Sequence, residues 1–260
     1  MTKSQIGAIA GAVVLFFVLY LGFDTIPPKQ KDLEKSRSFN LESTGVTNLI
    51  QDAQKKLTQE QISITEALNL DLEKSAKDTL KRIQILKSLS GTWYEMGFPS
   101  IAGAYAEDLA FLEKTKEAWS MAGTTYAICV KSAEDAKVKD FCSKRAIKSF
   151  ENAISIDPEN VESRINLAIC YVDNPDQGNP MKGILMLREL NSKYPENVSV
   201  LNQLGKLALQ TNQTDKAIER LETAIKLDPK NQNTICLLAS AYKNAGDITK
   251  SDEYQKKCIN

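Results

Sequence analysis

The chain has 260 residues, 42% of them hydrophobic and 25% charged, and its 33 basic and 33 acidic residues leave no formal net charge. This balance excludes a disordered chain and gives no electrostatic footprint for nucleic acid. Histidine is absent, so the usual general base near neutral pH and the commonest metal ligand are missing. We therefore expect no nucleic-acid partner, no cofactor, no metal site and no enzyme activity.

The first predicted element is a membrane anchor. After a short tail at residues 1–5, residues 6–23 carry no charge. Such a helix rises about 1.5 Å per residue and nearly matches a hydrocarbon core of about 30 Å. We favour a retained single-pass transmembrane helix over a cleaved signal peptide, because bulky side chains stand where a cleavage site needs small ones. Gly7 and Gly11 form a GxxxG pattern that suits a homodimer of such helices.

The charges around this segment bear on its orientation. One lysine precedes it, and four basic residues come closely after it: Lys29, Lys31, Lys35 and Arg37. The positive-inside rule then favours a cytoplasmic location for the rest of the chain. A periplasmic location is the alternative, because a lysine before a single N-terminal anchor often accompanies export.

Residues 24–45 are predicted to be a linker, and residues 46–82 a helical N-terminal cap or extension of the repeats beyond residue 83. Apolar residues recur there at helical spacing, and the polar stretch 58–61 permits a break into two helices. The five cysteines lack CxxC spacing, which predicts buried free thiols and a reducing compartment. They are Cys129, Cys142, Cys170, Cys236 and Cys258.

From residue 83 onward the sequence repeats itself. Three segments end in a proline, a charged residue and an asparagine, and their prolines, Pro158, Pro195 and Pro229, are spaced 37 and 34 residues apart. Such a period indicates one helical unit stacked on copies of itself. We expect an open array of helix pairs.

The units resemble the tetratricopeptide repeat (TPR), a helix-turn-helix family with a period of about 34 residues. The match is closest at 198–231, where the signature places hold Leu201, Leu204, Gly205, Ala208, Ala217, Leu221, Ala224 and Pro229. The resemblance implies that Gly205 and Ala217 are small because helices A and B cross there, and that Leu221 and Ala224 face the next unit. Pro229 would end helix B.

The other units match less closely. Unit 116–160 has its halves further apart than usual, so that residues 131–142 form an insertion that lengthens helix A or its turn; its packing residues are Trp119, Gly123, Tyr126, Ala146, Phe150 and Ala153. Unit 161–197 carries Leu167, Ala168 and Tyr171. A weak unit at 83–115 and a partial or capping unit at 232–260 complete the array over 83–260. The predicted fold class is an all-α TPR solenoid preceded by a transmembrane helix and a helical linker.

The resemblance also implies a concave groove that holds a segment of a partner protein. Its groove-facing places fall on Asn166, Asn202, Gln203, Lys206, Gln210, Lys243 and Asn244. Amides and lysines suit main-chain and carboxylate recognition, and an unpartnered solvated face is the alternative. We predict a non-catalytic, membrane-tethered scaffold that recruits or assembles a protein or peptide partner. The alternative is an accessory subunit of a larger membrane complex that uses its convex face, the 131–142 insertion or its anchor.

Overall fold

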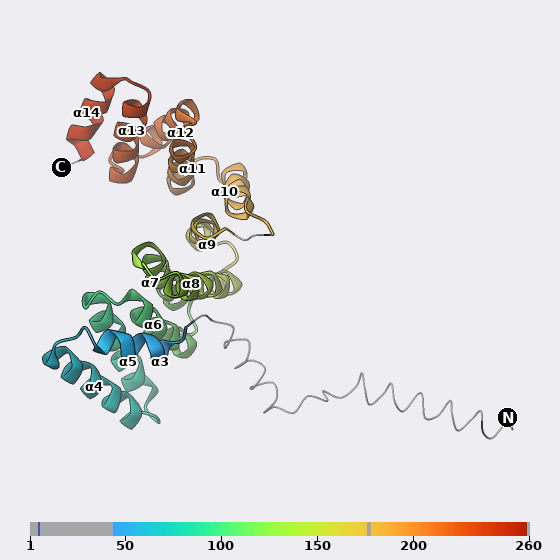
Figure 1. Ribbon diagram of the computed structural model, residues 1–260. Coiled ribbons are helices and arrows are strands. Elements are labelled where there is room, and N and C mark those ends of the chain that lie inside the picture. Colours follow the sequence, from blue (N-terminus) through green and yellow to red (C-terminus); the bar gives the residue numbers. More distant parts are fainter. Residues whose placement is uncertain (1–4, 6–43, 176–177, 259–260) are drawn as a thin grey trace. The chain divides into compact units, whose positions relative to one another are not determined.

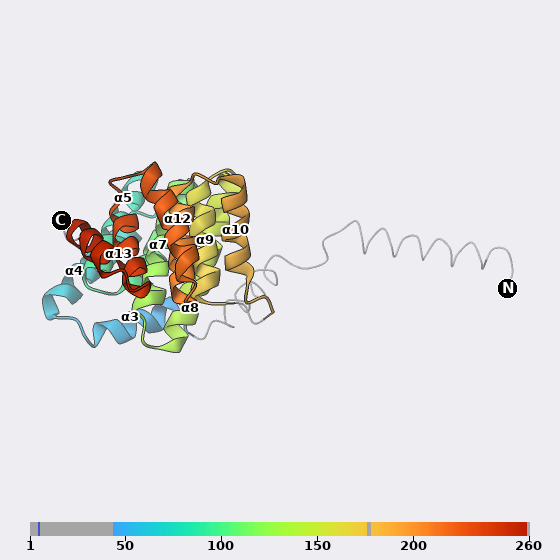
Figure 2. The ribbon, with the colours of Figure 1, turned by 90° about the horizontal axis from the view of Figure 1, so that it is seen from above.

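The computed structural model describes residues 5, 44–175 and 178–258. The predicted anchor at 6–23, the pair Gly7 and Gly11, the basic residues after them and nearly all of the linker lie outside the described residues. Residues 46–260 form one compact unit of the chain. From residue 59 onward its consecutive helices pack against one another in chain order (Figure 1; Figure 2).

The regular structure of the described residues is helical, which confirms the all-α prediction there. The helices are α3 (Val46–Gln54), α4 (Gln59–Lys74), α5 (Thr79–Glu95), α6 (Pro99–Glu113), α7 (Lys116–Ser132), α8 (Ala136–Ile156), α9 (Val161–Asp173), α10 (Lys182–Lys193), α11 (Val198–Gln210), α12 (Thr214–Leu227), α13 (Gln232–Asn244) and α14 (Ile248–Cys258). From α5 onward they form antiparallel pairs. The first helices of successive pairs also contact one another, α7 with α9, α9 with α11 and α11 with α13.

The break expected near residue 58 is present and has a local cause. The Thr58 side chain accepts a hydrogen bond from the N–H of Gln61 at 3.2 Å, and the Gln61 side chain accepts one from the N–H of Thr58 at 3.0 Å. This reciprocal capping box satisfies two backbone donors and starts α4 as a separate helix. The pair α5–α6 begins at Thr79, ahead of the predicted boundary at 83.

The predicted insertion lengthens both helices of its pair. Helix α7 has 17 residues where α9, α11 and α13 have 13, and α8 has 21 where α12 has 14. Only residues 133–135 lie between α7 and α8. The extra residues therefore make both helices of this pair longer than the helices that follow them, from α9 to α14.

The membrane prediction is corrected. Over 44–175 and 178–258, no helix is both long and apolar enough to cross a bilayer. The longest of them, α8, has lysines and an arginine along its 21 residues, and the more apolar α6 has only 15 residues. The prediction of a single-pass membrane location is therefore wrong, and the segment 6–23 that motivated it lies outside the described residues.

The cysteine prediction is also wrong for four of the five residues. Cys129 and Cys142 form a disulfide with Cα atoms 6.0 Å apart, and Cys236 and Cys258 form another with Cα atoms 5.0 Å apart. Each bond joins the two antiparallel helices of one pair, a proximity that linear spacing does not reveal. Disulfides persist in oxidising environments, so the argument for a reducing compartment fails. Cys170 is the one buried free thiol among the described residues, and burial raises its pKa to about 12.

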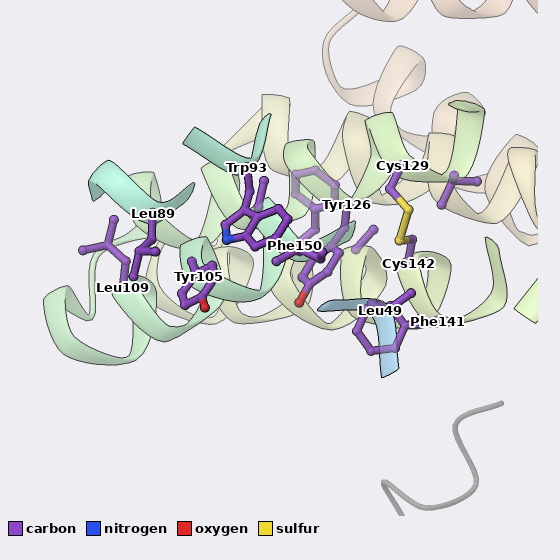
Figure 3. Packing of buried hydrophobic residues seen from close by; sticks show 14 of the residues in the cluster. Leu49, Leu89, Trp93, Tyr105, Leu109, Tyr126, Cys129, Phe141, Cys142 and Phe150 are labelled. Carbon is purple, nitrogen blue, oxygen red and sulfur yellow. A yellow bond between two sulfur atoms is a disulfide. The ribbon is translucent and has the colours of Figure 1, made fainter. Parts of the chain in front are cut away.

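The core is unevenly divided along the unit. One large apolar cluster runs from α3 to α9 and contains the rings of Trp93, Tyr126, Phe141 and Phe150 (Figure 3). Smaller clusters join α9, α10 and α11, and then α11 to α14. Leu49 of α3 belongs to the large cluster, and α3 packs against α6. Helix α3 therefore completes the core of the neighbouring pairs.

Candidate partner-binding surface

The turn between successive pairs is built by the repeated motif found in the sequence. Its asparagine is the N-cap of the next helix: Asn160, Asn197 and Asn231 accept hydrogen bonds from the N–H groups of Ser163, Val200 and Thr234 at 2.8, 3.0 and 3.0 Å. Such a cap satisfies a backbone donor that the helix itself leaves free. The motif therefore sets where α9, α11 and α13 begin, and with it which side chains they expose.

Two neighbouring turns also contact each other. Glu159 accepts hydrogen bonds from the amine of Lys193 at 2.7 Å and from the hydroxyl of Tyr194 at 3.0 Å. These bonds, that with Lys193 first, lower the pKa of the Glu159 carboxyl. The contact joins equivalent points of two repeats.

Helix α11 has a buried apolar face and a more exposed polar face. Leu201, Leu204 and Ala208 recur at helical spacing and are buried. Lys206 and Gln210 are exposed and Gln203 is half-buried. These three side chains line a small cleft of 20 Å³ together with Ile169, Val172, Asp173, Leu187 and Leu207. That space holds about one water molecule. The cleft is therefore a shallow surface that presents polar side-chain groups, and it is no enclosed pocket.

Asn202 does not belong to this accessible surface. It is only 3% exposed, and its side chain donates to Asn231 at 3.3 Å and accepts from the Thr234 hydroxyl at 2.9 Å. The expectation that Asn202 faces a partner is therefore corrected. It joins α11 to the start of α13, and a buried amide needs such partners.

The remaining predicted groove residues are spread over two helices. Asn166 is half-buried on α9, whereas Lys243 and Asn244 are exposed at the end of α13. The described cleft does not include them. The structure thus brings together only Gln203, Lys206 and Gln210 of the predicted set.

The predicted packing residues are all buried, and the glycines among them explain how closely the helices approach. A Cβ on Gly205 would lie 2.8 Å from the Leu221 side chain, and one on Gly123 would lie 2.9 Å from the Phe150 ring. Leu221 therefore fills the crossing of α11 and α12 besides packing with α13 residues. The contact with α13 residues agrees with the expectation that Leu221 faces the next unit, and the contact with Gly205 adds a role within its own pair.

Two further close-contact glycines escaped the sequence analysis. A Cβ on Gly183 would lie 2.4 Å from the backbone oxygen of Ala168, and one on Gly103 would lie 2.6 Å from the Tyr126 ring. Gly183 occupies the place that Ala217 has in the third unit. Alignment on that small-residue position is the signal that identifies Gly183.

A buried charged group was missed as well. The carboxylate of Glu107 on α6 accepts hydrogen bonds from the hydroxyl of Tyr126 at 2.8 Å and from the guanidinium of Arg145 at 2.7 Å. Burial, reinforced by Glu107, holds the pKa of Tyr126 well above its usual range. The group joins α6, α7 and α8 and is buried away from the surface of α11. Among the described residues, no group of three or more cysteines and carboxylates is placed to hold a metal ion.

Comparisons with known proteins agree with this architecture. The family profile of the tetratricopeptide repeat matches residues 198–231 and 233–260. A solved tetratricopeptide repeat protein from Parabacteroides merdae ATCC 43184 superposes with a TM-score of 0.54, covering 82% of this chain and 78% of that one at 13% identity. At such identity the likeness concerns the fold alone.

Two curated proteins are similar in sequence over part of the chain. Protein CTR9 homolog of Arabidopsis thaliana is 27% identical over 118 residues, which is 44% of this chain and 11% of that protein. Anaphase-promoting complex subunit 3 of Dictyostelium discoideum is 32% identical over 89 residues, which is 34% of this chain and 9% of that protein. This chain therefore spans only a small part of either relative. The profile matches show tetratricopeptide repeats at residues 198–231 and 233–260, and the helix pairs from α5 to α10 follow the same helix-pair plan.

Proposed function

We propose that this chain is a non-catalytic protein-binding scaffold that docks an extended segment of a partner on the polar face of α11. The observation that carries the proposal is the cluster of Gln203, Lys206 and Gln210 beside α9. Amide groups can both donate to and accept from a peptide main chain, and the Lys206 amine can bind a carboxylate.

The arrangement of this surface supports a shallow mode of binding. The capped start of α11 and the Gly205–Leu221 contact fix the helix, so the three polar side chains project from a rigid support. Ile169 and Val172 of α9 supply apolar area next to them. Because the Asp173 carboxylate also lines the cleft, the matching peptide places its acidic side chain at Lys206 and an aliphatic one at Ile169 and Val172. Lys243 lies further along on α13.

Selection of a phage-displayed random peptide library on the full chain tests the proposal. We expect the enriched peptides to contain acidic residues and to lose about tenfold in affinity on Lys206→Glu, because a favourable charge contact becomes repulsive. Lys148→Glu is the matched control, since Lys148 is exposed on α8 and lies outside the cleft. Peptides that bind both variants equally would reject the α11 surface.

A second candidate is an accessory subunit of a protein complex that uses the outer face of the second helices. Met181 and Leu185 are four residues apart at the start of α10 and are 47% and 51% exposed, which places two large apolar side chains on one helix face. One of the sequence relatives is by its name a complex subunit. Co-purification at fixed stoichiometry, abolished by Leu185→Glu and retained in Lys206→Glu, would favour this role over peptide docking.

A further inference from the structure

A second and larger depression lies away from α11. It has a volume of 390 Å³, is open to solvent, and is bordered by α3, by the turn between α5 and α6, and by the turn between α7 and α8. Volumes of about 300–1,000 Å³ are typical of sites for small ligands. A few residues of peptide fit such a space, whereas a folded domain does not.

Part of the pocket lining is apolar and buried. Leu49, Ala53 and Cys129 line the pocket and are 8%, 2% and 2% exposed. The Cys129–Cys142 disulfide closes the chain around the α7–α8 turn, and Figure 3 shows it near Leu49 and Phe141. Phe98 and Val138 contribute further apolar area. This part suits an aliphatic or aromatic side chain.

Ser100 supplies hydrogen-bond donors without an acceptor. It lines the pocket and is only 7% exposed, and within the described part of the chain neither its hydroxyl nor its N–H has a hydrogen-bond partner. Helix α6 begins after Phe98, and no side chain caps its first N–H groups. The Phe98 carbonyl accepts hydrogen bonds from the N–H groups of Ile101 and Ala102, which leaves the N–H of Ser100 without this acceptor. The Ser100 hydroxyl is not one of the fully buried side-chain atoms that lack a partner, and an N–H in the first turn of a helix is ordinarily left without an intrahelical acceptor. Both donors can therefore serve an acceptor oxygen that enters the pocket.

The charges at the rim decide which acceptor fits. Three carboxylates and one amine line the pocket, namely Asp52, Glu134, Asp135 and Lys56. Asp52 is paired with Lys55 at 2.7 Å, and Asp135 accepts the N–H of Lys137 at 2.7 Å. The acidic excess disfavours a free carboxylate and favours a cation. A neutral main-chain carbonyl on Ser100, next to a basic side chain at the rim, satisfies both features.

We propose that this pocket binds a short segment of a partner protein in which an apolar side chain is followed by an arginine or lysine. The apolar side chain occupies the space between Leu49, Phe98 and Val138. The main-chain carbonyl of that residue accepts hydrogen bonds from Ser100, and the basic side chain reaches Glu134. This site is separate from the α11 surface and shares no lining residue with its cleft.

The test uses the full chain and two synthetic probes, acetyl-Gly-Leu-Arg-Gly-amide and acetyl-Gly-Leu-Glu-Gly-amide, with binding followed by saturation-transfer NMR. We expect the arginine peptide to bind with a Kd of about 1 mM, as suits a few contacting residues, and the glutamate peptide to bind at least tenfold more weakly. Glu134→Lys should reverse this preference. Ser100→Ala should weaken the arginine peptide about fivefold, the loss of one ordinary hydrogen bond.

Two control variants keep the result specific. Glu151→Lys makes the same charge change on the exposed face of α8, and Lys206→Glu alters the α11 surface; both should leave the affinity of the arginine peptide unchanged. Circular dichroism checks that Ser100→Ala and Glu134→Lys remain folded. Absence of binding by the arginine peptide at about 10-fold above the expected Kd, or binding that is indifferent to Glu134→Lys, would overturn the proposal. Because Lys206→Glu removes only the α11 surface, failure of that surface and failure of this pocket are distinguishable.

Discussion

The α5–α8 region and the α11–α14 region share the same plan of paired helices but fill it differently. In α5–α8, aromatic rings lie against glycines, a carboxylate is buried with an arginine, and one helix pair is lengthened. In α11–α14, leucines and alanines fill small clusters, and the family profile matches there. The comparison teaches that family resemblance is clearest where packing is most regular, whereas the larger pocket lies where packing departs from it.

The buried pair of α6 and α8 gives the largest expected effect. Arg145→Ala leaves the Glu107 carboxylate, which is 8% exposed at its side chain, without its cationic partner. Removing one member of a buried ion pair costs about 3–5 kcal/mol. Chemical denaturation should register this loss. Lys144→Ala, which breaks an exposed pair with Asp140, should cost only about 0.3–0.5 kcal/mol; similar losses for both variants would mean that the buried group is not special.

The disulfides come next, because each region has one. Replacing Cys129 and Cys142 together by serine opens a loop of 13 residues, and Cys236 with Cys258 one of 22. Loop-closure entropy predicts a loss of about 3 kcal/mol for each. Thermal unfolding of both double variants measures it. A loss confined to the first pair would show that the α13–α14 bond adds little to stability.

Overpacking tests the more regular region. Gly205→Leu places a side chain against Leu221, where even a Cβ would lie 2.8 Å away, and should cost about 1–3 kcal/mol. Lys206→Ala at the adjacent exposed position should change the free energy of unfolding by less than about 0.5 kcal/mol. Equal shifts in Tm for the two variants would contradict the packing of α11 on α12.

The repeated caps should matter about equally along the chain. Asn160→Ala, Asn197→Ala and Asn231→Ala each remove an N-cap hydrogen bond and should each cost about 1 kcal/mol. Denaturant midpoints provide the measurement. Asn231 also forms side-chain hydrogen bonds with Asn202 and Thr234, so Asn231→Ala should cost at least as much stability as the other two variants. A smaller loss would contradict the role of Asn231 as an N-cap.

Acid should weaken the contact between neighbouring turns, the smallest effect. Hydrogen bonds from Lys193 and then Tyr194 lower the pKa of Glu159, and one from Lys116 lowers that of Asp157. A carboxyl whose folded pKa is depressed contributes stability above its unfolded pKa of about 4 and loses it as pH falls further. The unfolding midpoint should drop slightly below about pH 4, and less so in Glu159→Gln. An identical pH profile for that variant would show that the Glu159 contact adds no stability.

The sequence predicted the helix pairs well, because the small residues at Gly205 and Ala217 and the proline turns record local requirements of a repeat. It could not predict the disulfides or the Glu107–Arg145 pair, which depend on residues brought together only by packing. Asn202 shows the limit for the candidate site. Its place on the helix suggested a groove residue, but its partner Thr234 lies 32 positions away, and only the stacking of α11 on α13 brings the two together.

The bond between Cys236 and Cys258 affects how the array would come apart. In the described part of the chain, α14 packs chiefly against α13, so it has a neighbour on one side only. Helices in such a position are the first to fray in stacked arrays. With the bond intact, Cys258 at the end of α14 stays linked to Cys236 in α13, so α14 cannot separate fully from α13. The backbone amides of the two helices should therefore exchange with solvent at similar rates, through one shared opening.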